Sequence, residues 1–560
     1  MALLLQFWGL MAFGLSLLWR FGADVLSTMS SLLQPVPYLL VAVSLLFLLF
    51  ACHVSLRLFF WPFSRRSLPS SLNWAGADDG LFSNARANFR SLFHTRELVQ
   101  EGYYKYSKNN LPFVLPNITT GPEVILPMSQ MDWLLQQPDT VLSQTEVNRQ
   151  FLQADWTMLH PKIIQDGIHA DVIKREMTKF LGDFTEDVEE EIDYAFRTLW
   201  GTDTKNWVQV SAYHTMLDVI ARVSNRVLVG LPLCRDEEYL DSSKSFARFV
   251  VVQAAAISQC PNFLRCIVAP LLNIFDTIRY SKSVKYHVPI IEHRKSGPSD
   301  DENKKNDYIQ WSIDHSFRKN NPSERATDLI SKRLSVLQFA AIHSSAITLT
   351  NLLIDLASSA RISDYLSIIR NEVTAELAAE NGVWSKAVLA RMVATDSTIR
   401  ETLRLWAFVS RGLLKEVVKQ GGVTLPTGEH LPKGTKVGYH NYPIHHDADF
   451  YPDPMAFDPL RFCSRGEADE AADGKLPAEA AKKNIPLVRT SSAFMAFSHG
   501  KDACPGRFFA SQQLKLVVAY IALNYDIEPL ASRPDNLWLV GSQGPPMDVN
   551  VRIRRREGTV

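Results

Sequence analysis

Cysteine is scarce in this chain of 560 residues, which holds six cysteines and no Cys-x-x-Cys pair. Small secreted scaffolds held by disulfides are much richer in cysteine, so that class is excluded, and reduced thiols in a cytosol-facing protein are expected. An excess of one charge is also absent, because 59 Lys and Arg balance 59 Asp and Glu. The sequence therefore offers no basic field for a nucleic-acid partner.

Nucleotide-binding glycine motifs and fixed-period repeats are missing as well, so the chain is not expected to bind flavin or nicotinamide. Hydrophobic residues make up 46% of the chain and charged residues 21%. This balance supports a large core and argues against general disorder.

The first sixty residues differ from the rest of the chain. A membrane-spanning helix needs about 20 apolar residues, so either of two apolar segments, 1–19 and 37–60, could span. No clear cleavage site follows the first segment, which favours a retained anchor of one or two helices over a signal peptide. Arg57, Arg65 and Arg66 follow the second segment, and positive residues stay in the cytosol. We expect a membrane anchor at residues 1–61, a linker at 62–80 and a cytosol-facing catalytic domain at 81–560.

Helical periodicity dominates the sequence after the linker. Residues 326–360 contain no Gly or Pro and repeat apolar residues at helical spacing, so they predict the longest helix. Residues 421–439 carry Gly and Pro turn signals between short apolar pairs and predict a small antiparallel sheet. A final helix at about 505–524 and an exposed insertion at 465–484 are also expected. The expected fold class is mainly α, with a large helical domain and one small antiparallel β region.

The segment Phe494–Phe509 places Cys504 in a glycine-punctuated loop directly before the final predicted helix. N–H groups at a helix N-terminus lower the pKa of a thiol and can hydrogen-bond to its sulfur. Gly500 and Gly506 allow the chain to turn and a flat ligand to approach the backbone. A thiolate on such a bare loop suits haem iron as an axial ligand, so Cys504 is the predicted metal ligand.

The spacing of Phe497, Gly500, Cys504 and Gly506 resembles the cysteine-loop signature of the cytochrome P450 family, the haem-thiolate monooxygenases. The resemblance extends from about residue 80 to the C-terminus. It implies the cytochrome P450 fold and a haem cofactor bound by these four residues.

A Glu-x-x-Arg motif at Glu401 and Arg404 resembles a second motif of the family, and Arg461 lies in a segment that resembles the family's meander. Residues i and i+3 share a helix face, so their charges can pair. The resemblance implies a buried cluster of these three residues that serves folding and haem retention. The motif alone is not specific, since Glu146 and Arg149 have the same spacing and are expected on a solvated helix face.

The segment Phe339–Ser345 in the predicted long helix resembles the part of the family that covers the distal haem face. The resemblance implies that Ala340 and Ala341 leave space for dioxygen. His343 stands where the family usually has an acid, and Ser344 where it usually has a threonine. Hydroxyl and imidazole groups can both relay protons, so both residues are candidate catalytic groups and the choice between them stays open. By itself the segment would equally suit a core helix.

Haem propionates need cations, and here the sequence departs from the family pattern. The family usually has Arg or His two residues before the cysteine, whereas this chain has Asp502, which would repel a propionate. Trp156 and His160 resemble an early helix that contacts one propionate, and Arg411 stands where a strand-borne Arg reaches the other. Each of these three also suits a surface cation or a core residue with its own partner.

The resemblance implies a monooxygenase that inserts oxygen into a C–H bond, with the Cys504 thiolate favouring O–O cleavage. Because no flavin or nicotinamide motif is present, it also implies an NADPH-cytochrome P450 reductase that docks near Lys501 and Arg507. The anchor predicts contact with membrane lipid, a location at the endoplasmic reticulum and an apolar substrate. Likeness to fungal members indicates a secondary metabolite, such as a terpenoid, indole-diterpene or polyketide intermediate.

Two other functions fit a haem-thiolate protein. One is an isomerase or dehydratase that needs no external electrons, and the other is a non-catalytic, membrane-tethered haem protein. The hydroxyl of Ser344 favours a catalytic site, because a haem carrier has no need of a distal hydroxyl.

Overall fold

The computed structural model describes residues 68–558 except 79, 81–82, 118–119, 261, 297–304, 319–321, 464–483 and 540. The predicted membrane anchor at 1–61, the start of the predicted linker and the predicted insertion up to residue 483 therefore lie outside the described residues. The described residues all belong to one unit, residues 62–560.

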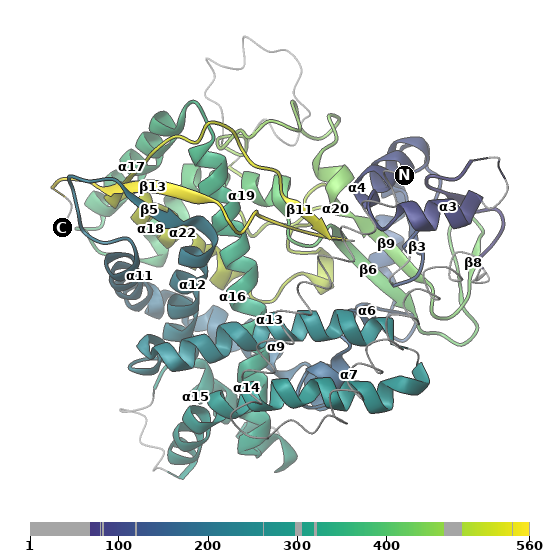
Figure 1. The fold of residues 1–560 in the computed structure, drawn as a ribbon, viewed down its shortest axis with the longest axis horizontal. Helices are drawn as coiled ribbons and strands as arrows, with labels where there is room; N and C mark the ends of the chain where they lie inside the picture. Colours follow the sequence, from purple (N-terminus) through teal and green to yellow (C-terminus); the bar gives the residue numbers. More distant parts are fainter. Residues whose placement is uncertain are drawn as a thin grey trace, which may run out of the picture. The chain divides into compact units, whose positions relative to one another are not determined.

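Helix α16 (Thr327–Ala357) runs through the middle of the helical part of the protein (Figure 1). It confirms the helix predicted at 326–360, apart from the first residue and the last three. Within the described ranges, α16 is the one helix long and apolar enough to cross a membrane, and 67% of its apolar window is buried inside the fold. Its apolar composition is therefore accounted for by its central position.

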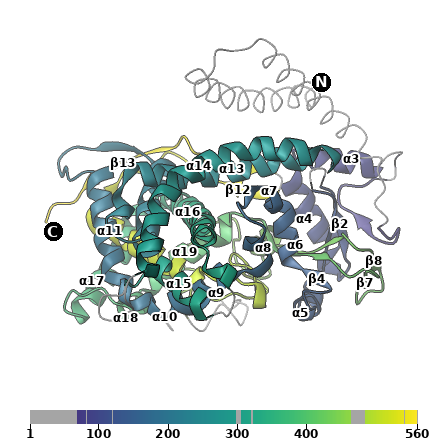
Figure 2. The same cartoon turned by 90° about the horizontal axis from the view of Figure 1, so that it is seen from below.

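The helices around α16 bury one apolar face each. On α11, for example, Val188, Ile192, Ala195 and Phe196 recur at helical spacing and are buried. Helices α12, α13, α14 and α19 contact α16 directly, and Figure 2 shows α16 nearly end-on beneath α13 and α14. In the described part of the chain, the helices of 11 residues or more besides α16 are α4 (Thr95–Lys105), α11 (Thr185–Leu199), α12 (Ala212–Leu228), α13 (Glu237–Gln259), α14 (Asn262–Ser296), α15 (Tyr308–Arg318), α17 (Ile362–Ala379), α19 (Val393–Trp406) and α22 (Arg507–Asn524).

Helix α14 has 35 residues and is longer than α16, so the prediction that 326–360 forms the longest helix is wrong. Pro270 and Pro289 lie inside α14. A proline removes one backbone hydrogen bond and usually ends or kinks a helix, which is why the sequence pattern hides this element. Packing against α13, α15 and α16 offsets the loss. The final predicted helix, in contrast, is confirmed as α22.

The largest sheet has six strands in the order β1-β2-β3-β9-β6-β4. Strand β1 is parallel to β2, and β3 is parallel to β9, so the sheet is mixed and larger than the small antiparallel sheet that was expected. The turn signals at 421–439 do form the antiparallel hairpin β7–β8, but β9 then leaves it to pair with β3 and β6. The strands of the large sheet and the hairpin are β1 (Asn73–Trp74), β2 (Phe113–Leu115), β3 (Glu123–Ile125), β4 (Leu142–Ser143), β6 (Arg411–Val417), β7 (Val423–Thr424), β8 (His430–Leu431) and β9 (Lys436–His440).

Strand β6 presents two different faces. Arg411 lies opposite His440 of β9, whereas Lys415 lies opposite Val437, with a register shift between residues 411 and 413. Side chains alternate along a strand, so residues opposite 440 and 437 project from opposite faces of the sheet. Arg411 and Lys415 therefore serve different sides of the sheet.

The remaining strands lie in small sheets. Strand β13 pairs with β10 and β5, and β11 pairs with β12. Their bounds are β5 (Val208–Ser211), β10 (Tyr525–Ile527), β11 (Leu537–Leu539), β12 (Ser542–Gly544) and β13 (Asn550–Arg555).

Candidate active site

The loop before α22 holds Cys504 by several backbone contacts. Its N–H donates to the carbonyl of Phe497 at 2.8 Å, which closes the loop on itself. Gly500 has a left-handed φ of +65°, and a Cβ there would meet Cδ2 of Leu135 at 2.8 Å. The side chain of Arg507, at the start of α22, donates from Nη1 to the carbonyl of Cys504 at 2.9 Å. The position of the cysteine is thus fixed relative to the helix that follows it.

The thiol of Cys504 has an electrostatic environment with two opposing parts. Burial raises its pKa, and the backbone N–H groups of Gly506 and Arg507 lower it by less. The helix N-terminus alone predicts a lowered pKa for this thiol, and the direction differs because burial is the larger effect. The two N–H groups are placed to stabilise negative charge on the sulfur once a cation replaces its proton.

Helix α16 carries an open face at its centre. Ala340 and Ser344, one helical turn apart, are exposed although Ile342, Ser345 and Ala346 beside them are buried. The hydroxyl of Ser344 donates to the carbonyl of Ala340 at 3.0 Å, so its oxygen can still accept a hydrogen bond. The face combines small side chains with one hydroxyl.

His343 lies on a different side of α16. Its Nε2 is 3.3 Å from the carbonyl of Lys244 on α13, and its Nδ1 is 3.4 Å from the hydroxyl of Tyr213 on α12. Burial lowers the pKa of His343, so the ring is neutral, with Nε2–H donating and Nδ1 accepting. Both ring nitrogens are therefore engaged with neighbouring helices, and the structure separates His343 from the open face that carries Ser344.

The residues around these two elements fit a haem group. Cys504 and Phe497 are only partly buried, although Phe494, Met495 and Ala503 of the same loop are buried, and a Cβ added at Gly506 would meet no atom within 4 Å. Ala340 and Ser344 leave a second surface, with small side chains and one hydroxyl, uncovered by the protein itself. A flat apolar group with a thiolate on one side and small side chains on the other matches both surfaces.

Glu401, Arg404 and Arg461 form one buried cluster. Arg404 donates from Nε and Nη2 to the two carboxylate oxygens of Glu401 at 2.7 and 2.8 Å, and neither side chain is exposed. Nε of Arg461 adds contacts of 3.0 Å to both oxygens. Glu146 and Arg149 have the same spacing on α6 (Gln144–Phe151) but are 23% and 40% exposed. The two copies of the Glu-x-x-Arg motif therefore differ in burial: the copy on α19 is buried and the copy on α6 is partly exposed.

A residue that sequence reasoning missed joins this cluster to the cysteine loop. His445, the last residue of α20 (Asn441–His445), is fully buried. Its Nδ1 lies 3.0 Å from the carbonyl of Arg404, and its Nε2 accepts from the backbone N–H of Met495 at 3.0 Å. Burial holds the pKa of His445 well below its usual value, so the ring stays neutral and can make both contacts. The sequence carries no motif around His445 that could have indicated this role.

The residues predicted to bind the haem propionates are Arg411, Trp156 and His160, and their surroundings differ. Nε of Arg411 donates to Glu123 at 3.0 Å, and His440 is 2.9 Å from the other oxygen of the same carboxylate. Burial alone would raise the pKa of Glu123, but Arg411 and the bond from His440 hold it at about 2. Trp156 lies on α7 (Ala154–Thr157) and is half-buried, as is His160, whose Nδ1 accepts from a backbone N–H at 3.1 Å. Arg411 therefore already has an internal counter-charge.

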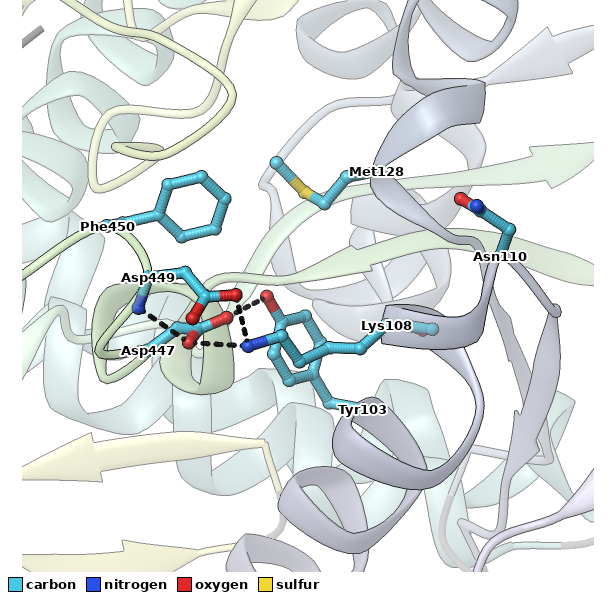
Figure 3. A pocket seen from close by; sticks show the side chains of 8 residues that line it. Tyr103, Lys108, Asn110, Met128, Asp447, Asp449 and Phe450 are labelled. Carbon is cyan, nitrogen blue, oxygen red and sulfur yellow. Dashed lines mark hydrogen bonds and ion pairs between the residues drawn. The ribbon is translucent and has the colours of Figure 1, made fainter. Parts of the chain in front are cut away.

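A surface pocket lies beside helix α4 (Thr95–Lys105), between it and the turn that follows α20 (Figure 3). The hydroxyl of Tyr103 donates to Asp447 at 2.7 Å. Nζ of Lys108 lies 2.9 Å from Asp447 and 2.6 Å from Asp449. Because these groups bind one another, the cluster acts as a polar cross-link between two distant parts of the chain.

Comparison with known proteins gives consistent matches. A family model described as Cytochrome P450 matches residues 164–548. The cytochrome P450 monooxygenase polB of Polytolypa hystricis is 32% identical over 514 residues, which cover 90% of this chain and 96% of the relative. The monooxygenase gloP of Glarea lozoyensis is 30% identical over 504 residues, covering 87% and 91% of the two chains. The monooxygenase astC of Aspergillus terreus is 29% identical over 506 residues, covering 87% and 92%.

Proposed function

The chain belongs to the cytochrome P450 family and is a haem-dependent monooxygenase, and we propose that Cys504 holds the haem iron. The observation that carries this assignment is the loop that fixes Cys504 at the start of α22, with two backbone N–H groups toward its sulfur. Bound haem supplies the activation of dioxygen and the insertion of one oxygen atom into a substrate C–H bond. Phe497, Gly500 and Gly506 would hold the group together with Cys504.

Ser344 is the proposed proton donor on the distal side. Its hydroxyl lies on the open face of α16 and already donates to the carbonyl of Ala340. A hydroxyl can pass on one proton while it accepts another, so Ser344 can connect the reacting oxygen with water. His343 supports this face indirectly, because it ties α16 to α12 and α13. Direct proton relay by His343 would require its ring to leave both contacts.

The haem propionates are proposed to meet Trp156, His160 and Arg411. The Nη groups of Arg411 are the part of that side chain not engaged with Glu123. The Glu401 cluster is proposed to retain haem indirectly, because Arg404 holds His445 and His445 holds the cysteine loop.

The proposed substrate is an apolar secondary metabolite, a terpenoid, indole-diterpene or polyketide intermediate. Small side chains at Ala340 and Ala341 leave room for a bulky apolar molecule over the open face. Electrons are proposed to come from an NADPH-cytochrome P450 reductase, which would dock near Lys501 and Arg507 on the cysteine side. The apolar segments before residue 62 support a location on the endoplasmic reticulum membrane, with the catalytic domain in the cytosol.

The assignment is tested by replacing the cysteine. The Cys504→Ser protein should lose the thiolate-type carbon monoxide difference spectrum and all product formation. Cys463→Ser is the matched control, because that thiol is also partly buried and contacts the carbonyl of Val393 and the side chain of Ser397. A Cys504→Ser protein that keeps the spectrum would exclude Cys504 as the ligand.

Turnover with and without reductase separates the three functions considered. A monooxygenase needs reductase, NADPH and dioxygen for product. An isomerase or dehydratase would form product without reductase, and a haem carrier would form none under either condition.

A further inference from the structure

A buried ion pair joins the cysteine loop to strand β6. Nζ of Lys415 lies 2.7 Å from Oδ2 of Asp502. The side chain of Lys415 is 0% exposed and that of Asp502 is 14% exposed. Within the described part of the chain, neither atom has a partner in hydrogen-bonding geometry. The contact is therefore held by opposite charge at close range and not by a directed hydrogen bond.

Either charged side chain would destabilise the folded protein if its partner were absent. Lys415 projects from the same face of β6 as Leu413 and Val417, which belong to an apolar core cluster. An ammonium group in such surroundings is retained only when a counter-charge compensates it. Asp502 lies two residues before Cys504, where a lone carboxylate would add negative charge beside a thiolate. Pairing removes both problems together.

The neighbouring cation does not serve this purpose. Nζ of Lys501 lies 2.8 Å from Oδ1 of Asp139, and these side chains are 44% and 69% exposed. Solvent and salt screen an exposed pair strongly, whereas a buried pair is screened much less. The charge of Lys415 therefore acts on the cysteine loop far more than the charge of Lys501.

We propose that Lys415 and Asp502 are positioning residues that hold the Cys504 loop against β6. Because their charges cancel, they also keep the net charge beside the thiolate near zero. The proposal rests on the assignment of Cys504 as the haem ligand. It also explains how this chain accommodates a carboxylate at position 502, since the compensating cation comes from another element of the fold.

Substitutions of similar size separate charge from packing. Asp502→Asn leaves the Lys415 cation uncompensated, which favours the electron-richer reduced haem and should raise its reduction potential. Lys415→Met leaves the Asp502 carboxylate uncompensated and should lower the potential. The double variant carries neither charge and should return close to the wild-type value. The measurement is a spectroscopic redox titration of the haem-loaded full-length protein, with Lys501→Met as a matched control expected to leave the potential unchanged.

Shifts of opposite sign that cancel in the double variant support the proposal. Shifts of the same sign, or no shift in either single variant, overturn it, because a pair with only a packing role would lower haem content without this pattern. If Lys415→Met binds no haem, the comparison of Asp502→Asn with the double variant decides: return toward the wild-type potential supports the proposal, and failure to return overturns it. All pair variants should keep the thiolate-type carbon monoxide spectrum that Cys504→Ser loses, so failure of the ligand assignment is seen separately.

Discussion

Ser344 and Ser345 are neighbouring hydroxyl groups with different surroundings. Ser344 is exposed on the open face of α16, whereas Ser345 is buried and accepts from Nε2 of Gln513 at 2.7 Å. Only Ser344 is therefore placed to exchange protons with a bound reactant. This contrast provides a test in which two hydroxyl groups of the same helix are compared.

Ser344→Ala should lower the amount of product formed per NADPH oxidised, while NADPH oxidation continues and hydrogen peroxide is released. Loss of one proton donor in catalysis costs about 10²–10⁴-fold, and the small end is expected because water can replace the hydroxyl on an open face. Product, peroxide and NADPH are measured together.

Ser345→Ala is the control for that experiment and should keep the wild-type coupling of NADPH to product. The double variant Ser344→Ala with His343→Ala tests whether the imidazole relays protons as well. A further loss in the double variant would assign His343 a share in the relay. Wild-type coupling in Ser344→Ala and in the double variant would contradict the proton-donor assignment.

The two Glu-x-x-Arg segments show at the level of elements what burial does to one motif. On α19, the Glu401 carboxylate is fully buried and bound by two guanidinium groups. On α6, Glu146 and Arg149 form a partly exposed pair. The same residue types at the same spacing therefore contribute very differently to the free energy of unfolding.

Glu401→Gln should destabilise the protein by about 3–5 kcal/mol, because it leaves Arg404 and Arg461 without their counter-charge in a buried site. Glu146→Gln, the matched control, should cost at most about 1 kcal/mol. Denaturant unfolding and haem content measure both effects. Equal stability of the two variants, with full haem content, would show that the buried cluster is not structural.

Sequence reasoning reached those parts of the site that depend on local spacing. The cysteine loop, the helix at 327–357 and the final helix follow from residue patterns that neighbours in the sequence determine. The contacts that depend on distant partners were not accessible. The sequence around Lys415 does not indicate a special role, because its partner Asp502 is distant in the sequence and only the fold brings the two together. His445 likewise belongs to no sequence motif.

The sheet and α14 show the same limit. Turn signals identify the β7–β8 hairpin, but nothing in residues 436–440 indicates that β9 pairs with β3 from the N-terminal part of the chain. In α14, two prolines argue against a helix locally, and only packing with three other helices outweighs them.

Several buried histidines make the stability of the whole molecule depend on pH. Burial lowers the pKa of His287 and His446 to about 3 and that of His169 to about 4. It also holds the pKa of His445 well below its usual value. The unfolded chain binds these protons near pH 6.5, whereas the folded protein does not, so their stabilising contribution is complete above pH 6.5 and is lost as the pH falls below it.

Carboxyl groups whose pKa is raised by burial act in the opposite direction; they are Asp276, Asp355, Glu189 and Glu191. Burial raises the pKa of Asp276 to about 7 and that of Asp355 to about 6, so the folded protein holds these protons in a range where the unfolded chain has released them. The histidines with a lowered pKa, which also include His343, outnumber the carboxyl groups with a raised pKa, so the free energy of unfolding should fall as the pH falls from 6.5 to 5. Denaturant unfolding at a series of pH values measures this slope, and a flat profile between pH 6.5 and 5 would contradict it.

Removal of residues 1–61 should release the protein from membranes and leave the haem spectrum intact. The apolar composition of those residues is the reason for this expectation. Sedimentation with microsomes measures it, with the full chain as the control. If the truncated protein still sediments, the exposed apolar residues Ile267, Leu271, Ile274 and Ile278 of α14 are the first surface to examine.

Strand β6 limits how this protein can diversify. Its two faces hold unrelated partners, Glu123 on one side and Asp502 on the other, and each depends on the register of the strand. An insertion or deletion of one residue would exchange the faces, turning Arg411 away from its carboxylate and leaving the loop of Cys504 without its cation. New substrate preferences should therefore accumulate as substitutions around the open face of α16 and as length changes elsewhere in the chain, while β6 keeps a constant length across descendants of this sequence.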